Sequence, residues 1–222
     1  MYIITGGAGF IGSNLVRALN RRGVEDILVV DTLLEAKKIN NLADCKIADF
    51  VDLEDFRGQL LSDRVSHSVR SVFHQGACSD TMATDGRYVM SLNFDYSKLL
   101  YHWCQEREVP LVYASSASVY GAGLIFSEDP ENEHPLNAYA FSKWLFDRYV
   151  SDHVSSRKAQ VVGLRYFNVY GPREDHKGRM ASVAWHFFNQ YRSEGIVKLF
   201  EGSGGYESGL QQRDFIYVGD AV

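Results

Sequence analysis

A glycine-rich turn close to the N-terminus limits the possible folds more than any other feature. Gly6, Gly9 and Gly12 stand at regular spacing between the apolar run Tyr2–Thr5 and the amphipathic stretch Phe10–Arg22. A buried strand that enters a helix through such a turn is typical of dinucleotide-binding α/β folds. The glycines allow a tight turn and the close approach of a pyrophosphate. The N–H groups and the positive dipole end of the helix would hold the phosphates.

The next apolar run ends in an acidic residue at the place where such folds bind the adenosine ribose. Asp31 closes the predicted strand Ile27–Asp31, roughly 20 residues after the glycine turn. A carboxylate there accepts hydrogen bonds from ribose hydroxyls, so the combination predicts a nicotinamide dinucleotide site. Thr32 could donate to a 2′-phosphate, and Lys37 or Lys38 could neutralise one. NADP and NAD therefore both remain open.

Short β-branched runs alternate with longer amphipathic stretches along the chain. This order predicts a Rossmann-type, doubly wound parallel sheet of the α/β class, covered by helices on both faces. We expect strands at Tyr2–Thr5, Ile27–Asp31, Lys46–Asp49, Ser71–Gln75, Leu111–Ala114, Val161–Arg165 and Phe215–Val218, and helices at Phe10–Arg22, Leu92–Arg107 and Ala138–Val154.

The chain divides into two parts on this pattern. Residues 1–165 are expected to form the dinucleotide-binding domain. Residues 166–222 are expected to form part of a smaller C-terminal substrate-binding domain. Gly219 and Asp220 resemble a helix start immediately before the final residues, so we expect the chain to be truncated.

Composition excludes several classes of function. The 222 residues carry a formal net charge of −5, which gives no reason to expect nucleic acid as a partner. Three cysteines stand at irregular spacings without a zinc pattern, so we expect reduced thiols in the cytoplasm and no metal. No signal peptide and no apolar run of membrane-spanning length are found.

A tyrosine and a lysine four residues apart form the candidate catalytic pair. Among the 13 tyrosines, Tyr139 alone precedes a lysine at this spacing, Lys143, which places both side chains on one helix face. A phenol with a pKa of ~10 is a poor base at neutral pH. We expect the Lys143 ammonium and a nicotinium charge to lower the pKa of Tyr139 by about three units, or roughly 4 kcal/mol. Lys143 could also hold the nicotinamide ribose.

A serine completes this candidate site. Ser116 follows the predicted strand Leu111–Ala114, at the carboxyl edge where open α/β sheets bind ligands. It could hydrogen-bond the reacting hydroxyl beside Tyr139. The order of glycine turn, Ser116 and Tyr139 with Lys143 predicts a redox site.

Several motifs resemble known families. TGGAGFIGS, SSASVYG and YAFSK resemble the extended short-chain dehydrogenase/reductase superfamily. Over nearly the whole chain, FHQGACS, GPREDHKGRMASVA, KLFEGS and RDFIYVGD are similar to the ADP-L-glycero-D-manno-heptose 6-epimerase family. The resemblance implies an NADP-dependent isomerase that inverts C6 of an ADP-linked heptose by oxidation and re-reduction. It further implies a role in making the lipopolysaccharide inner-core precursor, and a homo-oligomer.

The resemblance also assigns residues. It implies that Tyr139 and Lys177 are two acid/base groups; without it, Lys177 would be interpreted as a solvated charge. It implies cofactor contacts at Gly6, Gly9, Phe10, Ile11, Gly12, Asp31, Thr32, Lys38, Gln75, Gly76, Ala77, Cys78, Ser79, Asn93, Lys143 and Val169. It implies substrate contacts at Asn168, Arg179, His186, Phe200, Glu201, Gly202, Ser203 and Arg213.

Four features depart from the family pattern. Thr32 stands in place of an asparagine and Leu53 in place of a lysine, both of which weaken the prediction of NADP. Arg179 replaces a common serine, and the loop Gly204–Gln212 is longer than usual.

Two other functions compete with this hypothesis. A UDP- or dTDP-sugar 4-epimerase or dehydratase would share Ser116, Tyr139 and Lys143 but would not explain HKGRMASVA, and no acidic pair follows Ser116. A non-catalytic dinucleotide sensor commonly lacks the tyrosine–lysine pair, which is present here.

Overall fold

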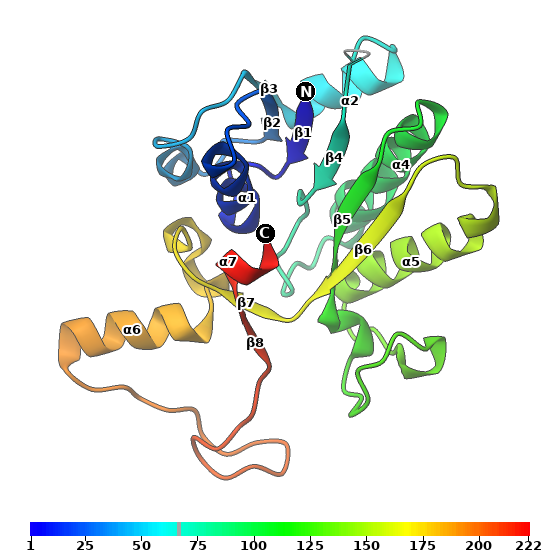
Figure 1. Ribbon diagram of the computed structural model, residues 1–222. Helices are drawn as coiled ribbons and strands as arrows, with labels where there is room; N and C mark the ends of the chain where they lie inside the picture. Colours follow the sequence, from blue (N-terminus) through cyan, green and yellow to red (C-terminus); the bar gives the residue numbers. More distant parts are fainter. Residues whose placement is uncertain (66–67) are drawn as a thin grey trace.

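A central parallel sheet carries the glycine turn. The computed structural model describes residues 1–65 and 68–222. Within these residues, six parallel strands pair in the order β3-β2-β1-β4-β5-β6 (Figure 1). Their bounds are β1 Tyr2–Thr5, β2 Ile27–Asp31, β3 Asp49–Asp52, β4 Ser71–His74, β5 Leu111–Ser116 and β6 Val161–Tyr166. The predicted Rossmann-type sheet is confirmed.

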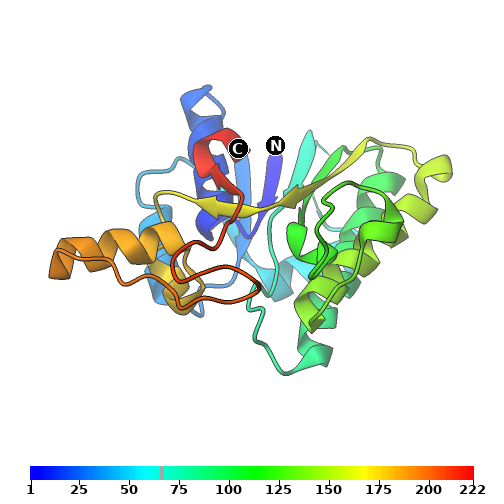
Figure 2. The same ribbon diagram turned by 90° about the horizontal axis from the view of Figure 1, so that it is seen from below.

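Helices cover both faces of this sheet. The α-helices of the described residues are α1 Phe10–Arg21, α2 Leu53–Leu61, α3 Gly86–Met90, α4 Tyr96–Glu106, α5 Ala138–Asp152, α6 Val183–Glu194 and α7 Val218–Ala221. A second, two-stranded parallel sheet joins β7 Asn168–Tyr170 to β8 Phe215–Tyr217. The helix α6 and the long loop between α6 and β8 project away from the main sheet (Figures 1 and 2).

Strands β2 and β3 lie on one side of β1, and the strands that follow them in the chain, β4 to β6, lie on the other. This strand pairs with β2 on one side and β4 on the other, with Ile4 opposite both Val29 and Phe73. Loops that leave the carboxyl ends of β1 and β4 therefore diverge to opposite faces, which opens a crevice between them.

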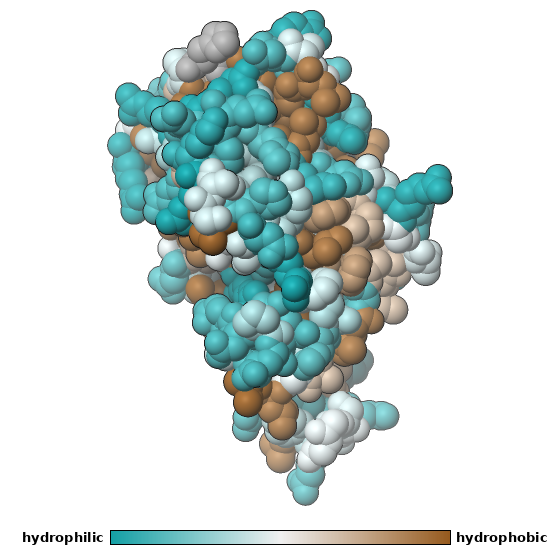
Figure 3. Space-filling model, turned by 90° about the vertical axis from the view of Figure 1, so that its right-hand side faces the viewer, coloured by the Kyte–Doolittle hydropathy of each residue, from teal (hydrophilic) through white to brown (hydrophobic). Residues whose placement is uncertain are grey.

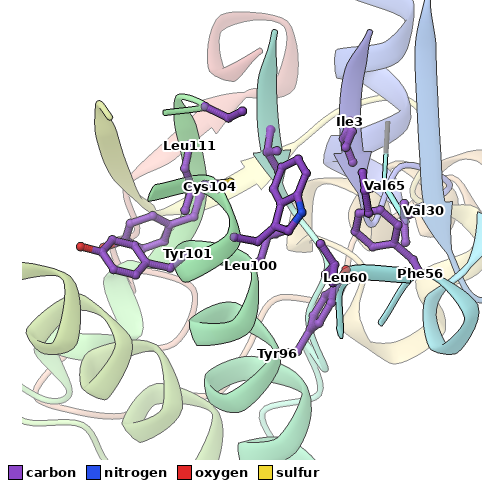
Figure 4. Close-up of a cluster of buried hydrophobic side chains, with 14 of the residues drawn as sticks. Ile3, Val30, Phe56, Leu60, Val65, Tyr96, Leu100, Tyr101, Cys104 and Leu111 are labelled. Carbon is purple, nitrogen blue, oxygen red and sulfur yellow. The ribbon is translucent and has the colours of Figure 1, made fainter. Parts of the chain in front are cut away.

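Side chains of the central strands point alternately to the two faces of the sheet, and each face has its own apolar core. Ile3 and Val30 are buried with α2 and α4 residues such as Phe56 and Leu100 (Figure 4). Their neighbours Ile4 and Val29 face the opposite way and pack against α1. Because successive side chains of a strand point to opposite faces, both faces of β1 and β2 are apolar and both must be covered.

A buried histidine ties β1 and β4 to the helical layer. The His74 ring lies 2.6 Å from the Thr5 hydroxyl through Nδ1 and 2.8 Å from the Ser97 hydroxyl through Nε2. Burial lowers the pKa of His74 to about 3, and the Lys143 charge acts in the same direction. The neutral imidazole is therefore part of the folded core.

Several predicted boundaries are wrong. The third strand begins at Asp49 rather than Lys46, because the backbone of Lys46 exchanges two 2.8 Å hydrogen bonds with the Asn20 side chain instead of pairing with β2. The predicted helix Leu92–Arg107 begins as a π-helical turn, Ser91–Asp95, before α4. Strand β5 extends to Ser116, and α7 begins at Val218, before the expected helix start.

The outer surface is mixed in character. The face on the right of Figure 1 is mostly hydrophilic, with separate hydrophobic patches (Figure 3). Within the described ranges, no helix combines the length and the apolar character needed to cross a membrane.

We expect His74 to make folding stability depend on pH. The unfolded histidine titrates near 6.5 and the folded one near 3, so stability falls as pH drops from 6.5 toward 3. The His74→Gln variant lacks this titration. Its deficit in unfolding free energy relative to the wild type should therefore shrink over this range, as measured by urea denaturation at several pH values. A constant deficit would contradict the assignment.

Candidate functional site

The carboxyl ends of the strands line one large cleft. Its volume is about 780 Å³, which suits a dinucleotide or a nucleotide sugar. Most of the predicted cofactor residues line it, together with the four predicted catalytic residues. Those that line it are Gly6, Gly9, Phe10, Ile11, Gly12, Asp31, Thr32, Lys38, Gln75, Gly76, Ala77, Cys78, Ser79, Ser116, Tyr139, Lys143, Val169 and Lys177.

The glycine turn leaves no room for side chains. Gly6 has a φ of 66°, and a Cβ built on it would lie 2.6 Å from the Gly76 nitrogen. Its own N–H donates to the Val30 carbonyl at 2.7 Å, which fixes the turn to β2. A Cβ on Gly12 would collide with the Gly6 carbonyl. The turn therefore has the close approach and the free helix N-terminus that a dinucleotide pyrophosphate requires.

Asp31 holds this turn in place. One carboxylate oxygen accepts the Ala8 N–H at 2.9 Å, and the other accepts the Thr32 N–H at 2.7 Å. The Lys38 ammonium donates to the latter oxygen at 2.9 Å. The predicted ribose ligand therefore also joins the glycine turn, the end of β2 and Lys38 into one unit.

Two buried polar atoms beside the cleft, an amide oxygen and a phenol hydroxyl, point to a polar ligand. Among the described residues, Gln75 Oε1 and the Tyr96 hydroxyl are buried without a hydrogen-bond partner, and both residues line the cleft. Buried polar atoms are normally paired, so these two suit groups of a bound molecule. Tyr96 could not be found from sequence reasoning, because nothing in the pattern around it separates it from the other aromatic residues of the chain.

Tyr139 and Lys143 lie on α5, with Ser116 at the end of β5. Asn137 caps α5 by accepting the Ala140 N–H at 2.8 Å, so the helix begins directly before Tyr139. The Lys143 ammonium is buried and donates to the Ala114 carbonyl at 2.7 Å. Burial lowers the pKa of Lys143 to about 8, while the Asp147 charge opposes this shift.

The predicted lowering of the Tyr139 pKa by Lys143 is wrong for the protein's own groups. Burial raises the pKa of Tyr139, and a hydrogen bond with Ser116 only partly opposes this. The reason is geometric, because Lys143 directs its ammonium to the Ala114 carbonyl. The protein alone thus favours the neutral phenol.

A buried carboxylate that the sequence reasoning missed supports this group. Asp147 accepts the Tyr113 hydroxyl at 2.9 Å, the Ser115 hydroxyl at 2.7 Å and Arg165 Nε at 3.1 Å. It therefore ties β5 and β6 to α5, next to Ser116 and one turn after Lys143. Asp147 stands four residues after Lys143, on the same face of the helix, and this spacing is the sequence signal that could have identified it.

Lys177 enters the cleft from another element. It lies in the helical turn η6, Asp175–Met180, and its ammonium is 5.1 Å from the centroid of the Phe10 ring. Burial lowers the pKa of Lys177, and the Glu174 charge opposes this shift. The turn η6 and the helix α5 are separate segments of the fold, and Lys177 and Tyr139 both line the cleft.

The structure brings only some of the predicted substrate residues to this cleft. Asn168 and Arg213 line it. Arg179 instead pairs with Asp80 at 2.8 Å on the surface, and His186 packs against Trp185 on α6. The segment 200–203 is exposed on the long loop before β8.

Asn93, a predicted cofactor residue, lies beneath the cleft. Its amide exchanges hydrogen bonds with the Cys78 backbone, accepting at 2.8 Å and donating at 3.0 Å, and donates to the Ser142 hydroxyl at 3.0 Å. It thus joins the loop after β4 to α5.

The family of the chain follows from comparison with known proteins. The model of the NAD dependent epimerase/dehydratase family matches residues 2–222. The chain belongs to this family. The resemblance found in its motifs is thereby confirmed, and a nicotinamide cofactor fits the glycine turn described above.

Two named relatives show which enzymes within this family the chain is similar to. The ADP-L-glycero-D-manno-heptose-6-epimerase of Alkalilimnicola ehrlichii is 58% identical over 222 residues, 100% of this chain and 69% of the relative. That of Thiobacillus denitrificans is 57% identical over 220 residues, 99% of this chain and 66% of the relative. The chain thus spans about two thirds of their length.

Solved structures agree with these relatives. The Helicobacter pylori ADP-L-glycero-D-manno-heptose-6-epimerase superimposes with a TM-score of 0.85 at 34% identity, covering 99% of this chain and 70% of that one. The UDP-glucose 4-epimerase of Thermotoga maritima, solved with UDP-glucose, has a TM-score of 0.78 at 27% identity and covers 99% and 70%.

We expect Asp147→Asn to destabilise the protein and the site together. The change removes one of the two carboxylate partners of Arg165, which keeps Glu133, and weakens the hydrogen bonds from the Tyr113 and Ser115 hydroxyls. The unfolding free energy should therefore fall by about 1–3 kcal/mol. Losing the Asp147 charge should also lower the pKa of Lys143 further below its present value of about 8. Urea denaturation measures the first effect. Asp152→Asn, exposed at the end of the same helix, is the control and should change neither quantity.

Proposed function

We propose that the protein is an epimerase that inverts C6 of the heptose in ADP-glycero-manno-heptose, for synthesis of the lipopolysaccharide inner-core precursor. The observation that carries this proposal is that Tyr139 on α5 and Lys177 on the turn η6 both line one cleft. Inversion of a carbinol centre needs a proton partner on each face, because hydride leaves from one face and returns to the other. The high identity to enzymes named for this reaction supports the substrate.

Tyr139, Ser116 and Lys143 form one proton-transfer group in this proposal. A bound nicotinamide would accept and return hydride, and the positive charge of its oxidised ring would favour the Tyr139 phenolate. Ser116 hydrogen-bonds Tyr139 and would orient the reacting hydroxyl. Lys143, anchored on the Ala114 carbonyl, would hold the nicotinamide ribose.

Lys177 serves the opposite face of the reacting carbon. It is held beside the Phe10 ring, where burial lowers the pKa of its ammonium toward the neutral range that a proton donor and acceptor needs. When Tyr139 serves one epimer, Lys177 serves the other. The remaining cleft residues on this side, Asn168 and Arg213, are proposed to bind the ADP-sugar, with Arg213 as a bidentate phosphate ligand.

NADP is the proposed cofactor. The Lys38 ammonium lies beside Asp31 and Thr32, the residues at the end of β2 that would face the adenosine ribose. A cation at this place can neutralise a 2′-phosphate, and NAD remains the second choice.

Three further proposals follow from the same reaction. We assign dinucleotide binding to residues 1–165 and substrate binding to 166–222. The biosynthetic use of a nucleotide sugar fits a cytoplasmic protein.

We also infer a homo-oligomer, in agreement with exposed apolar side chains such as Leu124 and Leu136. Light scattering of the purified protein measures the mass of the assembly.

Removal of either acid/base group should abolish turnover. Tyr139→Phe and Lys177→Met in the full-length protein should each slow conversion of ADP-D-glycero-D-manno-heptose to its L-glycero epimer by about 10²–10⁴-fold. The products are separated by chromatography. Lys46→Met, at an exposed ion pair, is the matched control and should remain active. Undiminished turnover in either variant would remove that residue from the mechanism.

A UDP-sugar 4-epimerase is the alternative, favoured by the likeness to the T. maritima enzyme solved with UDP-glucose. Wild-type protein that converts UDP-glucose and leaves the ADP-heptose untouched would establish this alternative.

The choice of cofactor is tested at Lys38. Lys38→Met should weaken NADP binding about tenfold and leave NAD binding nearly unchanged, since only NADP carries the 2′-phosphate. Fluorescence titration with the two reduced cofactors measures both constants. Equal weakening of both would mean that Lys38 acts through Asp31 rather than on the phosphate.

A further inference from the structure

A buried carboxylate lies directly before the turn that carries Lys177. Glu174 is 1% exposed, whereas glutamates are almost never fully buried without partners. One of its oxygens accepts the Gly171 N–H and the Ser182 hydroxyl, both at 2.9 Å. The other accepts the Ser182 N–H at 2.6 Å. Glu174 therefore fastens the two ends of the segment 171–182, here called the Lys177 hairpin, to each other.

The Lys177 hairpin needs such a fastening. Gly171, Arg173 and Gly178 have φ values of 147°, 79° and 52°, in a region that disfavours L side chains. Arg173 has a Cβ, so its conformation is strained and persists only because surrounding contacts impose it. The backbone carbonyl of Glu174 also accepts the Lys177 N–H at 2.9 Å. Both the side chain and the backbone of Glu174 thus shape the turn.

Glu174 also lies at the start of the next helix. Its carboxylate meets the N-terminus of α6, where Ser182 is the cap residue and accepts the Trp185 N–H at 3.1 Å. Two backbone N–H groups and a hydroxyl bind the two oxygens, and the helix dipole adds to their effect. No ion pair within 4.0 Å joins Glu174 to a cation in the described part of the chain.

The negative charge of Glu174 therefore acts on Lys177 without direct pairing. It raises the pKa of the lysine, against the larger lowering caused by burial. Other charged or titratable groups close by include Asp175, His176 and Arg179 on the same turn and Lys38 and Asp31 at or after the end of β2. The charges of Lys38 and Asp31 both act on the His176 ring. Lys38 and Asp31 pair with each other, so their charges largely cancel.

We propose that Glu174 is the positioning residue for Lys177. It holds the Lys177 hairpin so that the ammonium faces the cleft, and it favours the protonated, proton-donating form of this lysine. The inference rests on the proposed function, in which Lys177 is the second acid/base group. It explains how the lysine can be half-buried against an aromatic ring and still carry a proton.

The protonation state of Lys177 can be measured without turnover. Competitive acetylation with isotopically labelled acetic anhydride, followed by mass spectrometry of the Lys177 peptide, gives the pKa of this lysine from its reactivity at a series of pH values. Lys198, exposed beyond the end of α6, is the internal reference. In Glu174→Gln the negative charge is lost, and we expect the pKa of Lys177 to fall by about one unit while that of Lys198 stays constant.

Ser182→Ala is the matched variant. It removes one hydrogen bond to Glu174 and the cap of α6 but leaves the carboxylate charge in place. It should lower the melting temperature without shifting the pKa of Lys177. In the epimerase assay, Glu174→Gln should reduce kcat about tenfold or more with little change in KM, since Glu174 itself does not line the cleft.

The outcomes separate this inference from the function on which it rests. An unshifted Lys177 pKa in folded Glu174→Gln, or an equal shift in Ser182→Ala, would overturn the inference even if Lys177→Met is inactive. An active Lys177→Met variant would instead overturn the proposed function, whatever the acetylation shows. If Glu174→Gln does not fold, Glu174→Asp keeps the charge but withdraws the carboxylate. A lowered kcat in that variant then supports positioning, and an unchanged kcat refutes it.

Discussion

The close contact between the glycine turn and the ends of β1 and β2 is the constraint on which the rest of the structure depends. Gly6 donates to the Val30 carbonyl, and Ala8 donates to the Asp31 carboxylate. These bonds fix where α1 begins relative to the sheet. The helix N-terminus can then point into the crevice that opens because β1 pairs with strands on both sides. A side chain at Gly6 or Gly12 would collide with backbone atoms and push the turn away from this position.

Buried carboxylates recur wherever a functional segment must be held. Asp31 orders the glycine turn, Asp147 ties β5 and β6 to α5, and Glu174 orders the Lys177 hairpin. Each accepts hydrogen bonds from at least one backbone N–H or neutral hydroxyl. Such bonds satisfy a buried charge without fully neutralising it, so the charge still influences nearby ammonium groups. In Lys143 and Lys177 this influence opposes the effect of burial on the pKa.

Local patterns predicted most of the sheet, and their failures have physical causes. The strands at Tyr2–Thr5 and Ile27–Asp31 match, because both are mostly apolar runs between clear turn signals. The strand at Lys46 was misplaced because a distant side chain, Asn20, captures its backbone. The π-helical turn at Ser91–Asp95 was missed because Asn93 is drawn toward the Cys78 backbone, a contact between segments far apart in sequence.

The sequence by itself determined the fold class, the glycine turn and the placement of Tyr139 and Lys143 one turn apart on the same helix. These depend on spacing along one strand, one turn or one helix, which local geometry makes regular. Tertiary structure alone decided how the charges are arranged. Only the folded chain shows that Lys143 binds the Ala114 carbonyl rather than the Tyr139 phenol, and that Arg179 pairs with Asp80. Only the folded chain encloses Glu174 beside Lys177. Burial and electrostatic coupling are properties of neighbours in space, and no periodicity in the sequence encodes them.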